Sequence, residues 1–316
     1  MRILIEYLHE DKPDAKKILF TGLDDAGKTS IILALRREFS KIAVIKPSRG
    51  AQRRVFEFLG KDISEWDLGG QKSYRISYLK SPGKYFDKTE IAIYVIDVQN
   101  KTRINESLSY LKDVVNKFKD LEIEPPIFIF FHKFDPVLTK NSREDAHKLY
   151  LYLKNRIEKD INYEQIYYYQ TTIFNLSTII KPMSKILLSL YPKSKLIQKA
   201  ATEFATKFSA DGLEILDDNS LIVGSYYRND GIKDILNSTT PYFLSLNDSF
   251  QNSLNPMEEE QDNIEVQRYG KYFLFRQFTI GEGSPPYYLI LAKENPEFSN
   301  EDFDAFINLL KEILYK

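Results

Sequence analysis

The sequence predicts two domains of different class, an α/β domain on a mostly parallel sheet followed by an α+β domain on an antiparallel sheet. The chain has 316 residues, which exceeds the roughly 100 to 200 residues of a typical single domain. In residues 1–192, short apolar runs alternate with longer segments of helical period, as in strands joined by crossover helices. In residues 196–316 the apolar runs follow one another as hairpins, which is typical of an antiparallel sheet.

The elements of the first domain follow from these runs. Its strands are expected at KKILFTG, RRVFEFLG, ISEWDLGG, IAIYVIDV, PIFIFFHKFD and QIYYYQTT. The second and third runs are close enough in sequence to form a hairpin. Helical patterns begin after the first run and near Arg103, Arg143 and Leu176. The first of these helices, KTSIILALRREF, is expected to carry Phe39 on the same apolar face as Ile31.

The second domain has the predicted order α-β-β-α-β-β-β-α. A helix at residues 196–208 precedes two strands, GLEILDDN and SLIVGSYYR, and a helix that Pro241 is expected to interrupt. After the acidic stretch MEEEQDN come the strands IEVQRY, KYFLFRQFTI and PPYYLILAK. A final amphipathic helix contains Phe303 and Phe306. This order predicts a separate α+β domain.

Composition excludes several classes of function. The chain carries 44 Lys and Arg against 45 Asp and Glu, so its net charge of -1 offers no bulk attraction for nucleic acid or anionic lipid. It contains no cysteine, which excludes disulfides and thiolate chemistry and suits a reducing cytoplasm. The N-terminal residues lack a signal peptide, and no apolar run approaches the ~18 residues of a membrane span. We expect a cytoplasmic protein that reaches a membrane only through a partner.

A phosphate loop is predicted at GLDDAGKT, residues 22–29, between a predicted strand and a predicted helix. Its main-chain amides form an anion nest beside a helix N-terminus. Lys28 supplies a charge to the β and γ phosphates, and the Thr29 hydroxyl is expected to bind Mg²⁺. The alternative is a glycine turn with a solvated lysine. The expected nucleotide-binding residues here are Asp24, Asp25, Ala26, Gly27, Lys28, Thr29 and Ser30.

A second motif, WDLGGQ at residues 66–71, ends an apolar strand and forms what we call the switch segment. Asp67 can hold Mg²⁺ through water, Gly70 can direct its amide to the γ phosphate, and Gln71 can orient the attacking water. By itself this stretch would be an ordinary strand-ending turn. Beside a phosphate loop it predicts catalytic roles for Gln71, Lys28 and Gly70.

Between these motifs, IKPSRGAQRR is expected to close over the metal and the γ phosphate. Ser48 is the candidate for its metal-binding hydroxyl, although a solvated loop serine is an equal alternative. The predicted metal ligands are therefore Thr29, Ser48 and Asp67. Arg49, Arg53 and Arg54 are interpreted as a basic solvated edge rather than as a catalytic arginine.

A purine reader is predicted at FFHKFDPV, residues 130–137. The Asp135 carboxylate can accept from the guanine N1–H and 2-amino groups, which adenine does not offer, and the Lys133 stem can cover the ring. His132 stands where asparagine is usual and either ties the base loop to the phosphate loop or purine, or merely packs. In the stretch TTI, the amide of Thr172 or Ile173 is expected to meet the guanine O6.

Together these motifs resemble the Ras-superfamily small GTPases. GLDDAGKTS and WDLGGQ are most similar to the Arf group, whereas HKFD with the later TTIF is similar to the Rag/Gtr GTPases. The resemblance implies a P-loop GTPase domain at residues 1–192, a roadblock- or longin-like dimerisation domain at residues 196–316, and bound GTP or GDP with Mg²⁺. It also implies pairing with a second copy or with another Rag-like or roadblock protein, and docking on roadblock-containing scaffolds at a membrane. Ser48 departs from the threonine that most such switches use.

Three functions remain distinguishable. The leading hypothesis is a regulatory GTPase with slow hydrolysis, because no arginine is placed by the sequence to act in cis, so that an activator and an exchange factor are needed. An alternative is a scaffold or dimerisation subunit in which the nucleotide is structural. A P-loop kinase or ATPase is disfavoured by the guanine reader.

Overall fold

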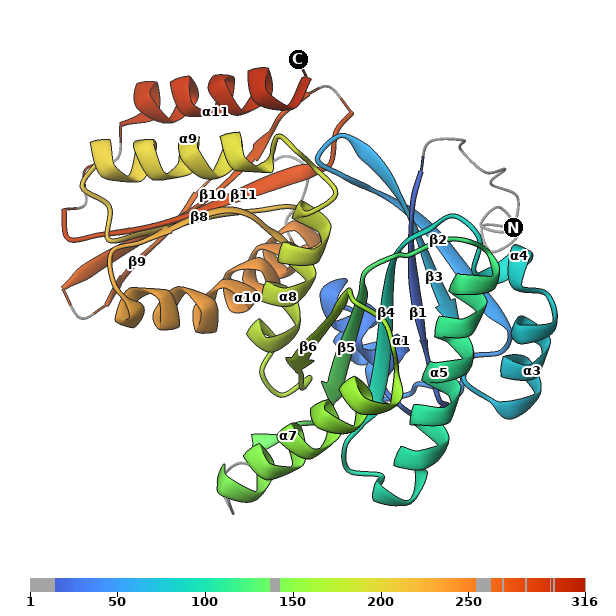
Figure 1. Cartoon of the computed structure of the whole chain (residues 1–316). Coiled ribbons are helices and arrows are strands. Elements are labelled where there is room, and N and C mark those ends of the chain that lie inside the picture. Colours follow the sequence, from blue (N-terminus) through green and yellow to red (C-terminus); the bar gives the residue numbers. More distant parts are fainter. Residues whose placement is uncertain are drawn as a thin grey trace. The chain divides into compact units, whose positions relative to one another are not determined.

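The structure is a computed structural model of the chain (Figure 1). It describes residues 15–136, 143–253, 263–268, 270–281, 283–295, 297 and 299–315. The N-terminal residues 1–14 and the acidic stretch at residues 257–262 lie outside the described residues.

By internal contacts the chain forms two compact units. The first comprises the described residues up to Ala34 together with Glu38–Ile179, and the second comprises Leu35–Arg37 together with the described residues from Ile180 onward. The contacts thus divide the chain inside helix α8 (Ser177–Leu188), whereas the sequence pattern predicts the change of architecture at residues 192–196.

The first unit is built on a six-stranded sheet in the order β2-β3-β1-β4-β5-β6. Of its described strand pairs, β2 with β3 is antiparallel and the other four are parallel. This confirms the mostly parallel sheet and the hairpin that the sequence predicts. The strands are β1 (Lys16–Gly22), β2 (Ala51–Phe58), β3 (Lys61–Leu68), β4 (Thr89–Asp97), β5 (Ile127–His132) and β6 (Ile166–Gln170).

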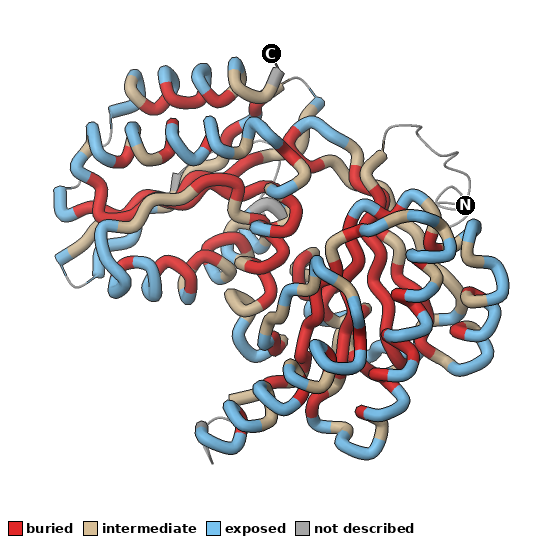
Figure 2. Tube along the Cα trace, viewed as in Figure 1, coloured by how far each residue is buried: buried red, intermediate tan, exposed pale blue. Residues whose placement is uncertain are grey.

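The central strands are buried because helices cover the sheet. All six residues of β5 are buried, as are six of the seven in β1, which explains their continuous apolar runs. Figure 2 shows these strands as the buried centre of the unit. Helix α5 packs an apolar stripe onto the core through Leu108, Leu111, Val115 and Phe118.

The helices of the first unit agree with the predicted starts near Arg103, Arg143 and Leu176. Two short helices, α3 and α4, are not among the elements predicted from the sequence, because α3 buries only Arg75 and Tyr78 and so shows little apolar periodicity. Besides the start of α8, the unit contains α1 (Lys28–Leu35, except its last residue), α2 (Phe39–Ile42), α3 (Lys72–Lys80), α4 (Pro82–Tyr85), η1 (Lys101–Arg103), α5 (Ile104–Asp120) and α7 (Arg143–Asp160).

The first helix ends earlier than predicted. Arg37 adopts a left-handed conformation with φ 58°, and the Glu38 amide donates to the Leu33 carbonyl at 2.9 Å. This is the hydrogen bond of a Schellman cap, which stops the helix. Phe39 therefore lies in the separate helix α2 with 39% of its surface exposed, so its predicted place on the apolar face of Ile31 is wrong.

The second unit has a five-stranded antiparallel sheet in the order β8-β7-β11-β10-β9. The predicted order α-β-β-α-β-β-β-α is confirmed. No helix in the described part of the chain is long and apolar enough to cross a bilayer. The elements are α9 (Ser194–Lys207), β7 (Gly212–Leu216), β8 (Ile222–Tyr227), α10 (Asp230–Ser253), β9 (Asn263–Arg268), β10 (Lys271–Thr279), β11 (Pro286–Lys293) and α11 (Asn300–Tyr315).

Helix α10 continues through Pro241, so the predicted interruption is wrong. A proline inside a helix costs about 3 kcal/mol. The helix nevertheless packs Ile232, Leu236, Phe243 and Leu244 into the core of the second unit. Each such side chain contributes roughly 1.5 to 3 kcal/mol on burial, which together exceeds the local cost.

Candidate functional site

The phosphate loop joins the end of β1 to the start of α1. Gly22, Asp25 and Gly27 have positive φ angles of 138°, 59° and 95°. A Cβ added at Gly22 would lie 2.4 Å from the Val95 carbonyl oxygen, so only glycine fits there. Such a turn directs successive amides toward an anion, and the N-terminus of α1 adds its dipole.

Lys28 is the buried cation of this loop. Its Nζ donates to the Leu23 carbonyl at 2.7 Å and to the Gly22 carbonyl at 3.2 Å, and the residue is 5% exposed. Burial lowers the pKa of Lys28 to about 8, although Asp67 and Asp24 partly oppose this shift. A phosphate bound in the nest would place negative charge beside this buried ammonium and so favour its charged form.

The three predicted metal ligands lie together. Thr29 Oγ1 donates to Asp67 Oδ2 at 2.5 Å and is 2.7 Å from Ser48 Oγ, whose hydroxyl is 3.4 Å from the same carboxylate oxygen. Within the described residues, the buried Asp67 Oδ1 has no hydrogen-bond partner. Two hydroxyls and an unsatisfied carboxylate oxygen are the hard donors that Mg²⁺ prefers, so the residues present fit this ion.

The switch segment contacts the phosphate loop through its backbone. A Cβ added at Gly70 would lie 2.0 Å from the Asp24 nitrogen, and one added at Gly69 would lie 2.6 Å from the Ser48 carbonyl oxygen. Any side chain at either position would displace the loops. Gln71 follows directly, at the position that precedes helix α3, and is half-buried. The predicted catalytic residues Lys28, Gly70 and Gln71 are thus brought to one region, while their catalytic roles stay predictions.

The residues predicted to contact the base also meet at the carboxyl ends of the strands. Asp135 Oδ1 accepts from Thr172 Oγ1 at 2.6 Å, and its Oδ2 accepts from Gln99 Nε2 at 2.7 Å. Lys133 adopts φ 62°, and its Nζ donates to Asp97 Oδ2 at 2.9 Å. Sequence reasoning missed Asp97 and Gln99. Their signal was position, because both lie where β4 ends, at the same edge of the sheet.

Lys133 also approaches the phosphate loop, since its Nζ lies 3.6 Å from Asp25 Oδ2. The Asp25 side chain is 85% exposed. Two further residues predicted to bind the nucleotide are placed differently from Asp25. Ala26 is buried, and Ser30 lies in the first turn of α1.

His132 both packs and forms a hydrogen bond. Its Nδ1 is 2.9 Å from Thr171 Oγ1, and a Cβ added at Gly27 would lie 2.4 Å from its Cδ2. Burial and, to a lesser extent, Lys133 lower the pKa of His132 to about 4, so the ring is neutral near pH 7. The ring therefore links β5 to the turn after β6 and lies against the phosphate loop.

In the turn after β6, one of the two amides predicted to contact the base already donates a hydrogen bond within the protein. The Thr171 amide donates to the Phe131 carbonyl at 2.9 Å, and the Thr172 amide donates to Thr178 Oγ1 at 3.0 Å. Of the two amides predicted to meet the guanine O6, Ile173 is therefore the better candidate.

The arginine that approaches the phosphate loop is not one of those that the sequence analysis considered. Arg53 and Arg54 lie on strand β2, where Arg53 Nε donates to Ser64 Oγ at 3.0 Å. Arg103, which sequence reasoning did not consider, donates instead to Asp24 Oδ1 at 2.8 Å. Only the packing of η1 against the loop reveals it.

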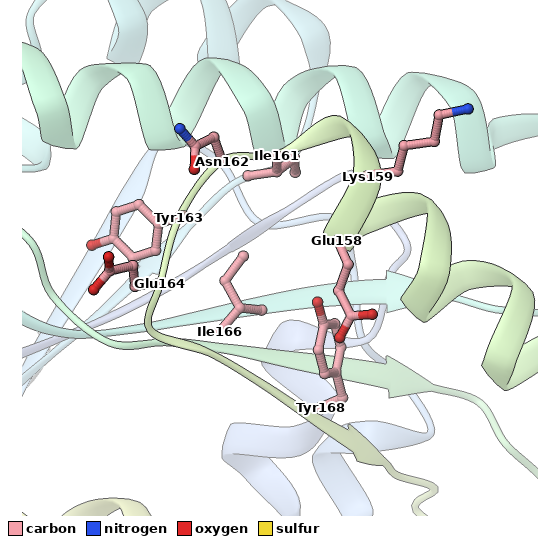
Figure 3. A pocket seen from close by; sticks show the side chains of 8 residues that line it. All are labelled: Glu158, Lys159, Ile161, Asn162, Tyr163, Glu164, Ile166 and Tyr168. Carbon is pink, nitrogen blue, oxygen red and sulfur yellow. The ribbon is translucent and has the colours of Figure 1, made fainter.

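A separate cavity of about 400 Å³ lies between the end of α7 and the start of β6, lined by eight residues of this segment, from Glu158 to Tyr168 (Figure 3). It is at the amino end of β6, opposite the edge at which the loops above gather. Its ionisable groups include Glu158 and Glu164 with a single lysine, Lys159. Two carboxylates do not suit a polyphosphate, so the nucleotide motifs and this cavity are unrelated.

Comparisons with known proteins show which family this chain is similar to. A family model described as "Gtr1/RagA G protein conserved region" matches residues 17–240. ADP-ribosylation factor-like protein 3 of Chlamydomonas reinhardtii is 37% identical over 134 residues, covering 42% of this chain and 71% of that protein. Ras-related GTP-binding protein A of Dictyostelium discoideum is 26% identical over 234 residues, covering 70% of this chain and 72% of that protein.

A small GTPase of Trypanosoma brucei, solved with the nucleotide analogue GppNp, matches with a TM-score of 0.41 and 18% identity, over 55% of this chain and 96% of that one. The Gtr1/RagA match, by contrast, spans more than half of the present sequence and includes the phosphate loop, the switch segment and the base reader. On this match, the chain belongs to the Gtr1/RagA family of small GTPases.

Proposed function

We propose that this chain is a guanine-nucleotide switch that binds GTP with Mg²⁺, hydrolyses it slowly to GDP and phosphate, and pairs with another chain through its second unit. Its family is one of GTP-binding proteins. The observation that carries the proposal is the convergence of oxygens from Thr29, Ser48 and Asp67 beside the phosphate loop. These residues come from three separate segments, and a divalent cation bound to a nucleotide gives them a common ligand.

In the proposed reaction, loop amides and Lys28 hold the β and γ phosphates. Gly70 can direct its amide to the γ phosphate because its backbone already lies against the loop. Gln71, the next residue, can orient the water that attacks the phosphorus. Bound Mg²⁺ supplies positive charge to the phosphate oxygens.

Guanine is the proposed base. Each oxygen of the Asp135 carboxylate accepts one protein hydrogen bond, from Thr172 and Gln99. A carboxylate oxygen has a second lone pair, so the two donors of guanine can add to these contacts without displacing them. The existing contacts would then hold the carboxylate in the orientation that guanine requires.

Slow hydrolysis is proposed because the nearby arginines are engaged. Arg103 pairs with Asp24, and Arg53 donates to Ser64. An arginine supplied to the transition state can be worth roughly 10³ to 10⁵ in rate. We expect an activating protein to supply this charge and an exchange factor to release GDP.

Single-turnover hydrolysis by the purified chain tests this proposal. The expected rate with Mg²⁺ is below roughly 10⁻² s⁻¹, and a faster reaction would contradict it. Gln71→Leu should slow hydrolysis while GTP still binds, with the exposed Gln165→Leu as the matched control. If Gln71→Leu changes neither nucleotide state nor partner binding, the nucleotide is a structural ligand and the chain acts as a scaffold.

Pairing is proposed through helix α10 and the sheet edges of the second unit, whose element order is similar to a roadblock-type domain. Ile235, Tyr242, Leu246 and Phe250 are exposed apolar residues of α10. Their spacing of seven, four and four residues places them along one stripe. Strands β8 and β9 are edges of the sheet, which can accept a further strand.

The proposed partner is a second copy or another Rag-like or roadblock-type chain, and any membrane contact would be made through such a partner. Light scattering of the full chain of 37.0 kDa tests for a homodimer. Tyr242→Glu with Leu246→Glu should abolish pairing, whereas Lys233→Glu, exposed on the same helix, should not. Pairing that survives the double change would place the interface elsewhere, and a monomeric wild type would leave a different chain as the partner.

A further inference from the structure

Four charged side chains form a continuous chain between the phosphate loop and the switch segment. Arg103 Nη2 donates to Asp24 Oδ1 at 2.8 Å, and its Nη1 lies 3.3 Å from the Asp24 carbonyl oxygen. Arg103 Nε donates to Glu106 Oε2 at 3.0 Å. The other oxygen of Glu106 pairs with Arg75 Nη2, and Arg75 Nε donates to the Gly70 carbonyl at 2.8 Å. The series of contacts thus runs from Asp24 through Arg103, Glu106 and Arg75 to the Gly70 carbonyl.

The Arg75 guanidinium is fixed from more than one side. The residue is 7% exposed, and its Cζ lies 5.0 Å from the centre of the Tyr110 ring. The Tyr110 hydroxyl is in turn 3.2 Å from Thr21 Oγ1 in strand β1. A planar guanidinium held in this way can serve two acceptors in a defined geometry, which a lysine cannot do.

The two carboxylates of this network stay charged near pH 7. The hydrogen bond from Arg103 is the main cause that lowers the pKa of Glu106, and Arg75 adds to it. Burial acts to raise the pKa of Asp24, but the hydrogen bond and charge of Arg103 outweigh burial and lower it. The contacts are therefore ion pairs rather than neutral hydrogen bonds.

We propose that Arg103 and Arg75 are positioning residues of the switch: Arg103 compensates the Asp24 charge of the phosphate loop, and Arg75 holds the Gly70 peptide against that loop. This inference rests on the proposed GTPase function. Arg103 compensates Asp24, whose negative charge lies in the loop that receives a polyphosphate. Arg75 fixes the Gly70 carbonyl and so the start of the peptide that leads to Gln71. Glu106 joins the two arginines.

The two arginines have different expected effects. Loss of Arg103 leaves the Asp24 charge to repel the nucleotide, and GTP, which carries more negative charge than GDP, is repelled more. Loss of Arg75 frees the Gly70 peptide and displaces Gln71, which affects the reacting geometry more than ground-state binding.

A double-mutant cycle tests the role of Arg103. Calorimetric titration with Mg²⁺ should show that Arg103→Ala weakens GTP binding about 10-fold more than GDP binding, and that Asp24→Asn with Arg103→Ala recovers most of this loss. Lys101→Ala removes an exposed cation of the same short helix and is the matched control. If the two changes are additive, or if Lys101→Ala gives the same effect, the proposal is overturned.

Hydrolysis tests the role of Arg75. Arg75→Ala should lower the single-turnover rate about 10-fold or more while GTP affinity changes by less than about 3-fold, and Arg75→Lys should recover only part of the rate. Lys72→Ala, an exposed cation of α3, is the control. Equal losses in rate and affinity, or full recovery by lysine, would refute a positioning role.

Two further readouts keep these results interpretable. Fluorescence of Trp66, the single tryptophan, reports whether each variant retains a folded first unit. If a variant of Arg75 is unfolded, Glu106→Gln is used instead, and a rate equal to that of the wild type would count against the network. If the wild type itself binds neither GTP nor GDP, the proposed function fails, whereas normal wild-type binding with an additive cycle contradicts only the network.

Discussion

In the first unit polar side chains gather where parallel strands end, whereas in the second unit buried acids surround a single antiparallel strand. Asp67 belongs to β3 and Asp135 follows β5. Asp211, Glu214 and Asp217 lie immediately before, within and after β7. The two groups also differ in how the protein satisfies them.

The buried acids of the second unit have protein partners. Asp211 pairs with Lys271 at 2.6 Å and with Arg228 at 2.9 Å. Glu214 accepts from the hydroxyls of Tyr227 and Thr240, and the Asp217 carboxylate caps the turn between β7 and β8.

In the first unit, Asp67 Oδ1 is the one buried carboxylate oxygen of the described residues without a hydrogen-bond partner. A buried acceptor left unpaired costs about 1 to 3 kcal/mol. The comparison teaches that the protein satisfies its structural acids internally and leaves part of an acid free where a ligand is proposed.

The largest expected effect comes from changing the base reader. Asp135→Asn should weaken GTP binding by roughly 10³-fold or more and favour xanthosine triphosphate, because the amide reverses one hydrogen bond to the base. Competition binding with both nucleotides measures this. Glu214→Gln in the second unit is the matched control and should leave nucleotide affinity unaltered. Unchanged GTP affinity in Asp135→Asn would remove the guanine assignment and with it the contrast between the units.

The stability of the two units should depend on pH in opposite ways, because falling pH destabilises the first unit and rising pH destabilises the second. The pKa of His132 is about 4 in the folded protein against 6.5 for an ordinary histidine. Its contribution to the free energy of unfolding is therefore present above pH 6.5 and lost as pH falls toward 4. Burial raises the pKa of Asp217 to about 7 from 3.8, so its contribution is present below pH 3.8 and lost as pH rises through 7. The His132 shift corresponds to about 3 kcal/mol and the Asp217 shift to about 4 kcal/mol.

Trp66 fluorescence during urea unfolding follows the first unit, while circular dichroism follows both. His132→Asn should flatten the acid loss seen by fluorescence. The loss of stability between pH 4 and 7 should appear in circular dichroism but not in fluorescence. Asp217→Asn should flatten this loss. The same pH profile for both probes would break the distinction between the units.

A smaller effect is expected from Asp211→Asn. It removes the charge that Lys271 and Arg228 share, and a hydrogen bond to a charged group contributes about 2 kcal/mol. The free energy of unfolding of the second unit should fall by about this amount, measured by circular dichroism in urea. GTP affinity should not change, and a loss of nucleotide binding would show that Asp211 is more than a structural acid.

The smallest expected effect is the pH dependence of nucleotide binding. Lys28 has a pKa of about 8 when no phosphate is bound, and a phosphate favours its charged form, so binding takes up a proton above that pH. GTP affinity should be nearly constant from pH 6 to 7.5 and fall up to ~10-fold per pH unit above 8. Guanosine, which lacks phosphate, is the control ligand. A flat GTP profile to pH 9.5 would show that Lys28 does not contact the phosphates.

Local sequence determined the parts of this protein that depend on neighbours along the chain. The period of the apolar runs predicted the six-stranded sheet, the hairpin of β2 with β3, and the order of elements in the second unit. The fixed spacing within residues 22–29 predicted a strand, a turn and a helix. Such features can be predicted from the sequence because each residue's conformation there is set by residues within a few positions of it.

Tertiary structure decided the rest. Helix α10 runs through Pro241 because its apolar face is buried, and α1 stops at Leu35 because Arg37 adopts a left-handed conformation. The partners Arg103 and Asp24 are 79 positions apart, and Arg75 and Glu106 are 31 apart. No spacing rule predicts such pairs, because their geometry depends on how strands and helices pack once the chain has folded.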